Sequence, residues 1–216
     1  MTKSSRRFLE PDERIAEVLF GLIMVLTFTG SLSVAGEDRA EVRTMLIGAL
    51  GCNLVWGIID GVLYLMGCLA EKGRDLSIFH AVRNAANPQM AQRLIADALP
   101  PVVSSVLQTT ELETIHQRLG QLPDSPDHAR LDKRDWLGAI GVFLWVFLST
   151  FPVAIPFVFI KDAGLALRVS NGVAVAMLFL AGYAYGKWVG RRPWLTGISM
   201  VVLGCALVSL TIVLGG

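Results

Sequence analysis

A single carboxylate, Asp60, lies inside an otherwise uncharged apolar stretch that extends from Met45 to Ala70. Placing a charge at the centre of a membrane-spanning helix costs about 2.5–3.5 kcal/mol on insertion scales, so such residues usually face a bundle interior, a water-filled path or a partner. A carboxylate in that position can bind a cation or exchange a proton. The structural alternative is a protonated or Tyr64-bonded aspartate that holds two helices together. Asp60 is therefore the first candidate functional residue.

Helical spacing places further potential ligands near this carboxylate. One face of the first apolar segment carries Glu17, Met24, Thr27 and Ser31, and one face of the second carries Asn53, Gly57, Asp60 and Tyr64. At 1.5 Å per residue, Met24 lies about 1–2 Å and Asp60 about 4 Å to the same side of the centre of their segments, so the two can share a layer if the helices face each other. Oxygen ligands suit hard divalent ions, and a thioether adds a preference for softer transition metals. The pattern predicts a cation site formed by Asp60, Met24, Asn53 and Glu17, with Thr27, Ser31 and Tyr64 lining the path.

Each of these side chains also has an ordinary structural explanation. Thr and Ser often bond to carbonyls of their own helix, Met is a common filler, and Asn53 can join two helices. Pro152 and Pro156 predict a bend that releases backbone carbonyls, and they are expected to line the same path, although a static kink explains them equally well. The cysteines are expected to be small apolar filler rather than metal ligands, since no CxxC spacing exists.

These residues must be positioned by membrane helices. The chain has 216 residues, of which 53% are hydrophobic, and its net charge of +1 excludes a dedicated nucleic-acid binder. Five apolar segments reach the length of about 20 residues that a span needs. They are Ile15–Ala35, Met45–Ala70, Leu137–Ile160, Leu165–Gly186 and Trp194–Gly216. The sequence predicts an all-α integral membrane protein with five transmembrane helices.

The distribution of Lys and Arg sets the expected orientation. With a cytoplasmic N-terminus, 15 of the 19 fall on the inside, which the positive-inside rule favours, so the topology is N-in and C-out. The expected organisation is a cytoplasmic segment over residues 1–14, spans one and two over 15–70, a cytoplasmic helical region over 71–135, and spans three to five over 136–216. A compact chain of this kind suits a bacterial inner membrane.

The polar region from 71 to 135 has the patterns of short helices. Asn87 and Pro88 form a cap and first-turn pair, and Thr110 with Glu113 forms a capping box. The helix that follows has an amphipathic face that needs a partner, and the region is too small to bury much core alone, which favours oligomerisation. Two small-xxx-small series either pack within the chain or form a dimer seam. They are Gly57 with Gly61, and Gly182 with Gly186 and Gly190.

Four stretches carry a family resemblance. They are RIAEVLFGLIMVLTFTGSLSVAG (14–36), ALGCNLVWGIIDG (49–61), FPVAIPF (151–157) and LAGYAYGKWVGRRPW (180–194). In their order, spacing and topology they resemble the vacuolar iron transporter family, whose members are five-span dimers with a helical cytoplasmic domain between spans two and three. The resemblance implies a homodimer in lipid that moves ferrous iron or manganese out of the cytoplasm, in exchange for protons, with no permanently bound cofactor.

The chain departs from the family pattern at the expected site. Met24 stands where the family has a first-span Asp, and the family's second-span Met falls near Gly61, beside Asp60. We infer that acid and thioether have exchanged helices, and we expect Glu17 to serve the cytoplasmic opening. The missing first-span acid favours one alternative, a non-transporting membrane scaffold or interaction protein. An enzyme is not expected, because His80, His116 and His128 lack metal-ligand spacing and a nearby nucleophile.

Overall fold

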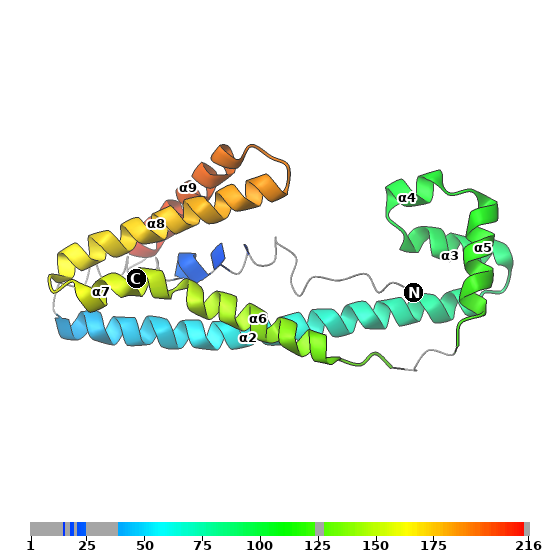
Figure 1. The fold of residues 1–216 in the computed structure, drawn as a ribbon, viewed down its shortest axis with the longest axis horizontal. Helices are drawn as coiled ribbons and strands as arrows, with labels where there is room; N and C mark the ends of the chain where they lie inside the picture. The colour runs from blue at the N-terminus through cyan, green and yellow to red at the C-terminus, as the bar shows by residue number, and fades with distance from the viewer. Residues whose placement is uncertain (1–14, 16–17, 20, 25–38, 124–127, 214–216) are drawn as a thin grey trace. The chain divides into compact units, whose positions relative to one another are not determined.

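The computed structural model describes residues 15, 18–19, 21–24, 39–123 and 128–213, and its regular elements over these residues are all α-helices. Residues 15, 18–19 and 21–24 are helical and are called the first-span segment below. The longer elements are α2 (Arg39–Arg83), α3 (Pro88–Ala98), α4 (Pro101–Val106), α5 (Thr109–Gly120), α6 (Lys133–Ser149), α7 (Phe151–Phe159), α8 (Ala163–Trp188) and α9 (Pro193–Val213) (Figure 1). They form two compact units: a membrane unit, Met1–Tyr64 with Arg134–Gly216, and an insertion unit, Leu65–Lys133.

Four stretches of the described helices are long and apolar enough to cross a membrane. They are Leu46–Arg83, Lys133–Phe159, Ala163–Trp188 and Pro193–Leu210. These four overlap the second to fifth predicted spans, so the all-helical membrane architecture is confirmed for that part of the chain. Most of the first predicted span lies outside the described residues.

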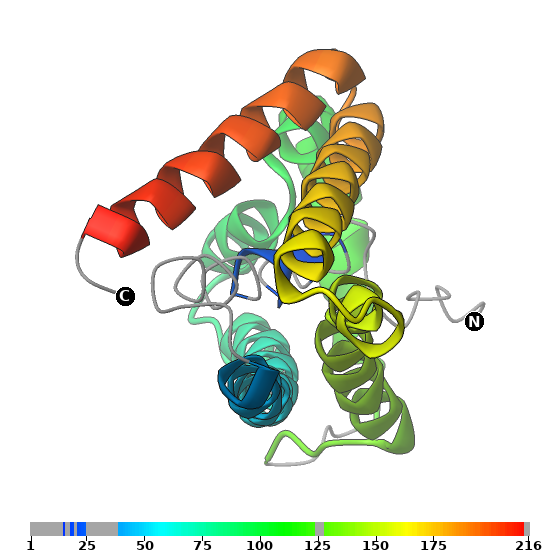
Figure 2. The same cartoon turned by 90° about the vertical axis from the view of Figure 1, so that its left-hand side faces the viewer.

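The glycine series of the membrane unit serve helix packing within the chain. Gly182 and Gly186 let α8 approach the start of α9, where an added Cβ would lie 2.9 Å from the Thr196 carbonyl oxygen and 2.9 Å from the Pro193 Cα, respectively. Figure 2 shows the hairpin that α8 and α9 form. The chain turns between these helices at Gly190, whose φ of 73° favours glycine.

Gly57 and Gly61 have the same role between α2 and α6. An added Cβ at Gly57 would meet the Phe143 side chain at 3.0 Å, and one at Gly61 would meet the Ala139 carbonyl oxygen at 3.2 Å. Of the two explanations left open for these glycines, the structure supports close packing inside one chain.

The first-span segment also belongs to the core of the membrane unit. Its Leu22 is fully buried and clusters with Val153 of α7 and with Ala174 and Leu178 of α8. This cluster fixes the segment beside α7 and α8, so that the residues next to Leu22 can reach the inner faces of α2 and α6.

The insertion unit has a small apolar core of its own. Val82 at the end of α2 packs with Ala91 and Ile95 of α3, and the amphipathic face of α5 completes the cluster with Leu112, Ile115 and Leu119. The predicted face of α5 therefore finds its partner within the insertion unit.

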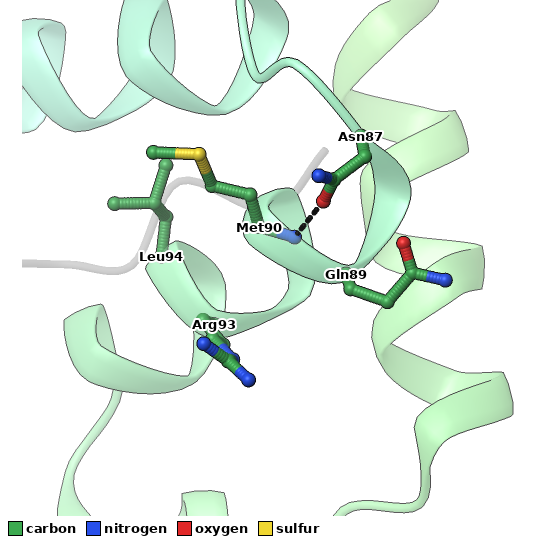
Figure 3. A pocket seen from close by; sticks show the side chains of 5 residues that line it. All are labelled: Asn87, Gln89, Met90, Arg93 and Leu94. Atoms are coloured by element: carbon green, nitrogen blue, oxygen red, sulfur yellow. Dashed lines mark hydrogen bonds between the residues drawn. The ribbon is translucent and has the colours of Figure 1, made fainter.

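The caps of the insertion unit are partly as predicted. Asn87 Oδ1 accepts a 2.8 Å hydrogen bond from the Met90 N–H, which confirms the cap of α3 (Figure 3). The capping box predicted at Thr110 and Glu113 is wrong, because α5 begins two residues earlier and the Gln108 N–H bonds to Glu111 Oε2 at 2.8 Å. Glu113 instead joins α5 to α3.

The link between these two helices predicts a pH dependence. The Gln92 amide donates to Glu113 Oε2 at 2.9 Å, and this bond lowers the pKa of Glu113 below its usual 4.5. A lowered pKa in the folded state contributes stability that is fully present above the ordinary value and is lost as the pH falls through the lowered one. We expect amide exchange in α3 and α5, corrected for intrinsic rates, to accelerate below pH 4.5 in the wild type. Glu113→Gln should remove that dependence, whereas exposed Asp97→Asn should preserve it.

Candidate metal-ion site

Asn53 is more deeply buried than Met24 and Asp60, the other two predicted ligands that the structure describes. Its side chain is 0% exposed, and its amide nitrogen donates to the carbonyls of Val146 at 3.0 Å and Phe147 at 3.3 Å, and to Thr150 Oγ1 at 3.1 Å. These acceptors are at or beside the C-terminal end of α6, where helical carbonyls lack partners within the helix. Asn53 therefore joins α2 to α6, as its structural explanation predicted.

The acceptors are free because the third span breaks at this point. Helix α6 ends at Ser149 and α7 begins at Phe151, so the last carbonyls of α6, including those of Val146 and Phe147, have no donor within the helix. Local hydroxyls supply the missing donors: Ser149 Oγ bonds to the Val146 carbonyl at 2.7 Å and Thr150 Oγ1 to the Phe147 carbonyl at 2.9 Å. The helix is interrupted beside Pro152, where the sequence predicted a bend, and the Val146 and Phe147 carbonyls at the break are satisfied by side chains.

The fourth span adds one more polar group next to this break. Ser170 of α8 is fully buried and donates to the Val153 carbonyl at 2.7 Å, while Pro156 is buried inside α7. We call Asn53, Ser149, Thr150 and Ser170 the polar cluster. Sequence reasoning missed its three hydroxyl residues, although two of them directly precede the Phe151–Pro152 pair, and a hydroxyl there is a recognisable signal for a broken span.

The side-chain carbonyl oxygen of Asn53 is the atom of this amide that a ligand can bind. Its carbonyl oxygen, Oδ1, is buried and has no hydrogen-bond partner among the described residues. Burying an unsatisfied amide oxygen costs about 1–3 kcal/mol, so an arrangement that persists needs a reason. A cation or a water molecule bound at Oδ1 would remove this penalty.

The first-span segment faces α2 at the level of Asn53. Cys52 Sγ lies 3.9 Å from Met24 Sδ, and Gly21 lies so close to α6 that an added Cβ would lie 3.2 Å from the Val146 carbonyl oxygen and clash with Ser149 Oγ. The segment therefore touches both α2 and the end of α6. The predicted contact between the first two spans exists at this point.

Asp60 lies at a different level of the same helix. Its Oδ2 atom is buried, and the residue follows Asn53 by seven positions, so it projects within about 20° of Asn53 and about 10 Å further along α2. Met24 contacts Cys52, eight residues before Asp60, which is about 12 Å away along the helix axis. Met24 and Asp60 therefore do not share a layer, although their depths along the two spans allowed them to. The structure places them at two levels, one with the sulfur atoms and Asn53, the other with Asp60.

The remaining predicted residues are placed as follows. Tyr64 packs its phenol ring against α6 at Gly138, on the face that also carries Asn53, Gly57 and Gly61. Glu17, Thr27 and Ser31 lie outside the described residues. Over the residues that the structure does describe, no group of three or more His, Cys, Asp or Glu side chains gathers that could hold a metal ion.

The four long apolar helices, with a buried polar cluster between them, are those of an integral membrane protein. A model of the VIT family, the vacuolar iron transporter family, matches residues 84–216, more than half of the chain, so the protein belongs to this family. The family transports iron or manganese ions, and its members are not enzymes. No curated protein matches the chain. The matched range begins after α2, so the roles of Met24, Asn53 and Asp60 must be argued from their own geometry.

The bonds of Asn53 predict a loss of stability when its side chain is removed. Asn53→Ala deletes two hydrogen bonds to α6 and one to Thr150, and interhelical hydrogen bonds in membranes contribute about 0.6 kcal/mol on average and up to about 1.7 kcal/mol. We expect the free energy of unfolding in mixed micelles to fall by about 1–2 kcal/mol. Leu54→Ala, at the exposed neighbouring position of α2, should change it much less. Equal losses in the two variants would contradict the joining role.

Proposed function

We propose that this protein exports Fe²⁺ or Mn²⁺ from the cytoplasm in exchange for protons, and that Asp60 is the group that binds both. The observation that carries the proposal is the buried carboxylate oxygen of Asp60 within an apolar span. Family membership supports the class of ion. Because a carboxylate loses its affinity for a cation when it is protonated, one residue can couple the release of metal to the uptake of a proton.

The two levels on α2 supply a route for the ion. In the proposed N-in topology α2 runs towards the cytoplasm, so Asp60 lies closer to the cytoplasmic end than Asn53 and Met24 do. The ion passes Glu17, binds at Asp60, and moves about 10 Å to the Asn53 carbonyl and the Met24 thioether. Protonation of Asp60 then prevents its return. Moderate, replaceable contacts of this kind suit a passing ion better than a closed cage does.

Other side chains complete the proposed path. Tyr64, Thr27 and Ser31 line it, and the break that Pro152 and Pro156 cause gives the third span a point at which it can bend. The protein acts as a homodimer in a bacterial inner membrane, with the insertion unit on the cytoplasmic side.

Reconstitution tests this function directly. We expect the purified protein in proteoliposomes to move Fe²⁺ and Mn²⁺ across the bilayer, and an imposed pH gradient of the correct sign to accelerate the flux. Internal pH, followed with a dye, should change together with metal movement. Metal flux that ignores the pH gradient would contradict proton exchange, and absence of metal flux would contradict transport.

A membrane scaffold is the second candidate, and the bonds of Asn53 to α6 and to Thr150 favour it because they explain this residue without an ion. A scaffold should show no metal-dependent change in stability. A transporter that binds Mn²⁺ or Fe²⁺ should be stabilised by mass action as the free ion concentration rises. Thermal unfolding across a panel of divalent ions therefore separates the two candidates.

A further inference from the structure

One pair of potential soft-metal ligands in the membrane unit is not the pair that the family pattern indicates. Cys52 on α2 and Met24 on the first-span segment bring their sulfur atoms to 3.9 Å. We propose that Cys52 is a metal ligand, and that Cys52, Met24 and the carbonyl oxygen of Asn53 form a binding level selective for thiophilic transition-metal cations. The inference rests on the proposed function, since it adds a ligand to the same ion path and defines the class of ion that this path prefers.

The distance between the two sulfur atoms fits a shared metal ion. Metal–sulfur bonds to zinc are about 2.3 Å long, and two bonds of that length to atoms 3.9 Å apart enclose an angle of about 115°. This angle lies between the trigonal and tetrahedral values, so both sulfur atoms can bind one ion without movement of the helices. Both residues are only partly buried, which leaves room for an ion to approach.

Asn53 provides an independent indication of a ligand at this level. It follows Cys52 directly on α2, it is 0% exposed, and its buried Oδ1 has no hydrogen-bond partner among the described residues. The bonds of its amide nitrogen to Val146 of α6 and to Thr150 hold the side chain in one orientation and leave the carbonyl oxygen as its remaining polar atom. The Asn53 side chain projects about 100° round α2 from that of Cys52, and we propose that its carbonyl oxygen turns towards the first-span segment to complete the binding level.

The chemistry of this set predicts its selectivity. Thiolate and thioether ligands favour soft or borderline ions, whereas Mn²⁺ and Mg²⁺ prefer carboxylate, carbonyl and water oxygens. Cysteine binds a metal as the thiolate, so binding transfers the Cys52 thiol proton to water as the metal–sulfur bond forms. Asp60, about 12 Å along α2, is an oxygen ligand and lacks this preference. The sulfur level therefore distinguishes thiophilic ions such as Fe²⁺ and Cd²⁺ from Mn²⁺.

Binding of Cd²⁺ and Mn²⁺ to the full-length protein tests the proposal. Calorimetric titration and the ultraviolet charge-transfer band of cadmium thiolates are measured for the wild type, Cys52→Ser and Cys205→Ser. Cys205 lies on α9 and serves as the matched control. We expect Cys52→Ser to weaken Cd²⁺ binding by about tenfold or more and to abolish the band, because loss of even an outer-shell partner costs about 10–100-fold in metal affinity. Its Mn²⁺ affinity should stay within about twofold, and Cys205→Ser should resemble the wild type.

A second variant separates coordination from packing. Met24→Leu keeps a similar volume and removes the thioether, so it should weaken Cd²⁺ binding while the band from Cys52 remains. Absence of the band in the wild type, or equal losses of Cd²⁺ and Mn²⁺ affinity in Cys52→Ser, would overturn the proposal. Metal flux in proteoliposomes reports separately on the proposed function. Normal flux without a cadmium band contradicts only the role of Cys52, whereas a Cys52-dependent band without flux contradicts only transport.

Discussion

Asp60→Asn should remove nearly all metal flux while the protein remains folded. Asparagine has almost the same size as aspartate and keeps one carbonyl oxygen, so the packing of α2 should be preserved. It carries no negative charge, and it can neither balance the charge of a divalent ion nor accept the exchanged proton. Loss of the charge also removes an insertion cost of about 2.5–3.5 kcal/mol, so we expect the variant to be at least as stable as the wild type.

The measurement is initial Fe²⁺ and Mn²⁺ uptake in proteoliposomes, with the protein content and the elution volume matched between samples. Asp97→Asn, on the exposed surface of α3, is the matched control and should transport at the wild-type rate. Asp60→Glu retains the charge and should preserve part of the flux. Undiminished flux in Asp60→Asn would remove this carboxylate from the mechanism, and an aggregated Asp60→Asn with a well-folded Asp60→Glu would identify Asp60 as a structural residue.

The membrane helices could be predicted from the sequence because a segment spans the bilayer mainly on account of its length and low polarity. A run such as 165–186 needs only enough apolar residues to cross the hydrocarbon layer, and the observed α8 (Ala163–Trp188) differs from it by two residues at each end. The same holds for the cap at Asn87, which depends on residues adjacent in the chain. Features set by local chemistry and by the thickness of the bilayer are therefore predictable from a single sequence.

The candidate site was harder to predict from the sequence because it depends on which helices contact each other and on the register of those contacts. Depth along a span placed Met24 beside Asp60, whereas the contact of Met24 with Cys52 shifts it by about two helical turns. Periodicity also grouped Asn53 with a path along the first span but could not show that its amide would be bound to α6. The capping box failed for a similar reason, since Gln108–Glu111 and Thr110–Glu113 have the same spacing and only the tertiary bond to Gln92 decides between them.

The close contact between α8 and α9 at Gly182 carries the second large prediction. At Gly182 an added Cβ would lie 2.7 Å from Met200 Cγ, 2.9 Å from the Thr196 carbonyl oxygen and 3.0 Å from the Gly197 Cα. Two of these three atoms belong to the backbone of α9, so the methyl group can be accommodated only if the two helices separate. Overpacking of this kind costs about 1–3 kcal/mol, and larger side chains should cost more.

Gly172 provides a matched control on the same helix, because an added Cβ there meets nothing within 4 Å. Replacing glycine by alanine inside a helix favours the helix by up to about 1 kcal/mol, so Gly172→Ala should be neutral or stabilising. Gly182→Ala gains the same helix propensity, but it should lower the free energy of unfolding in mixed micelles. Gly182→Val should lower this free energy further. If the two alanine variants are equally stable, α8 and α9 are not held together at Gly182. A dimer seam at this glycine would instead make the loss depend on protein concentration, whereas packing within one chain makes it independent of concentration.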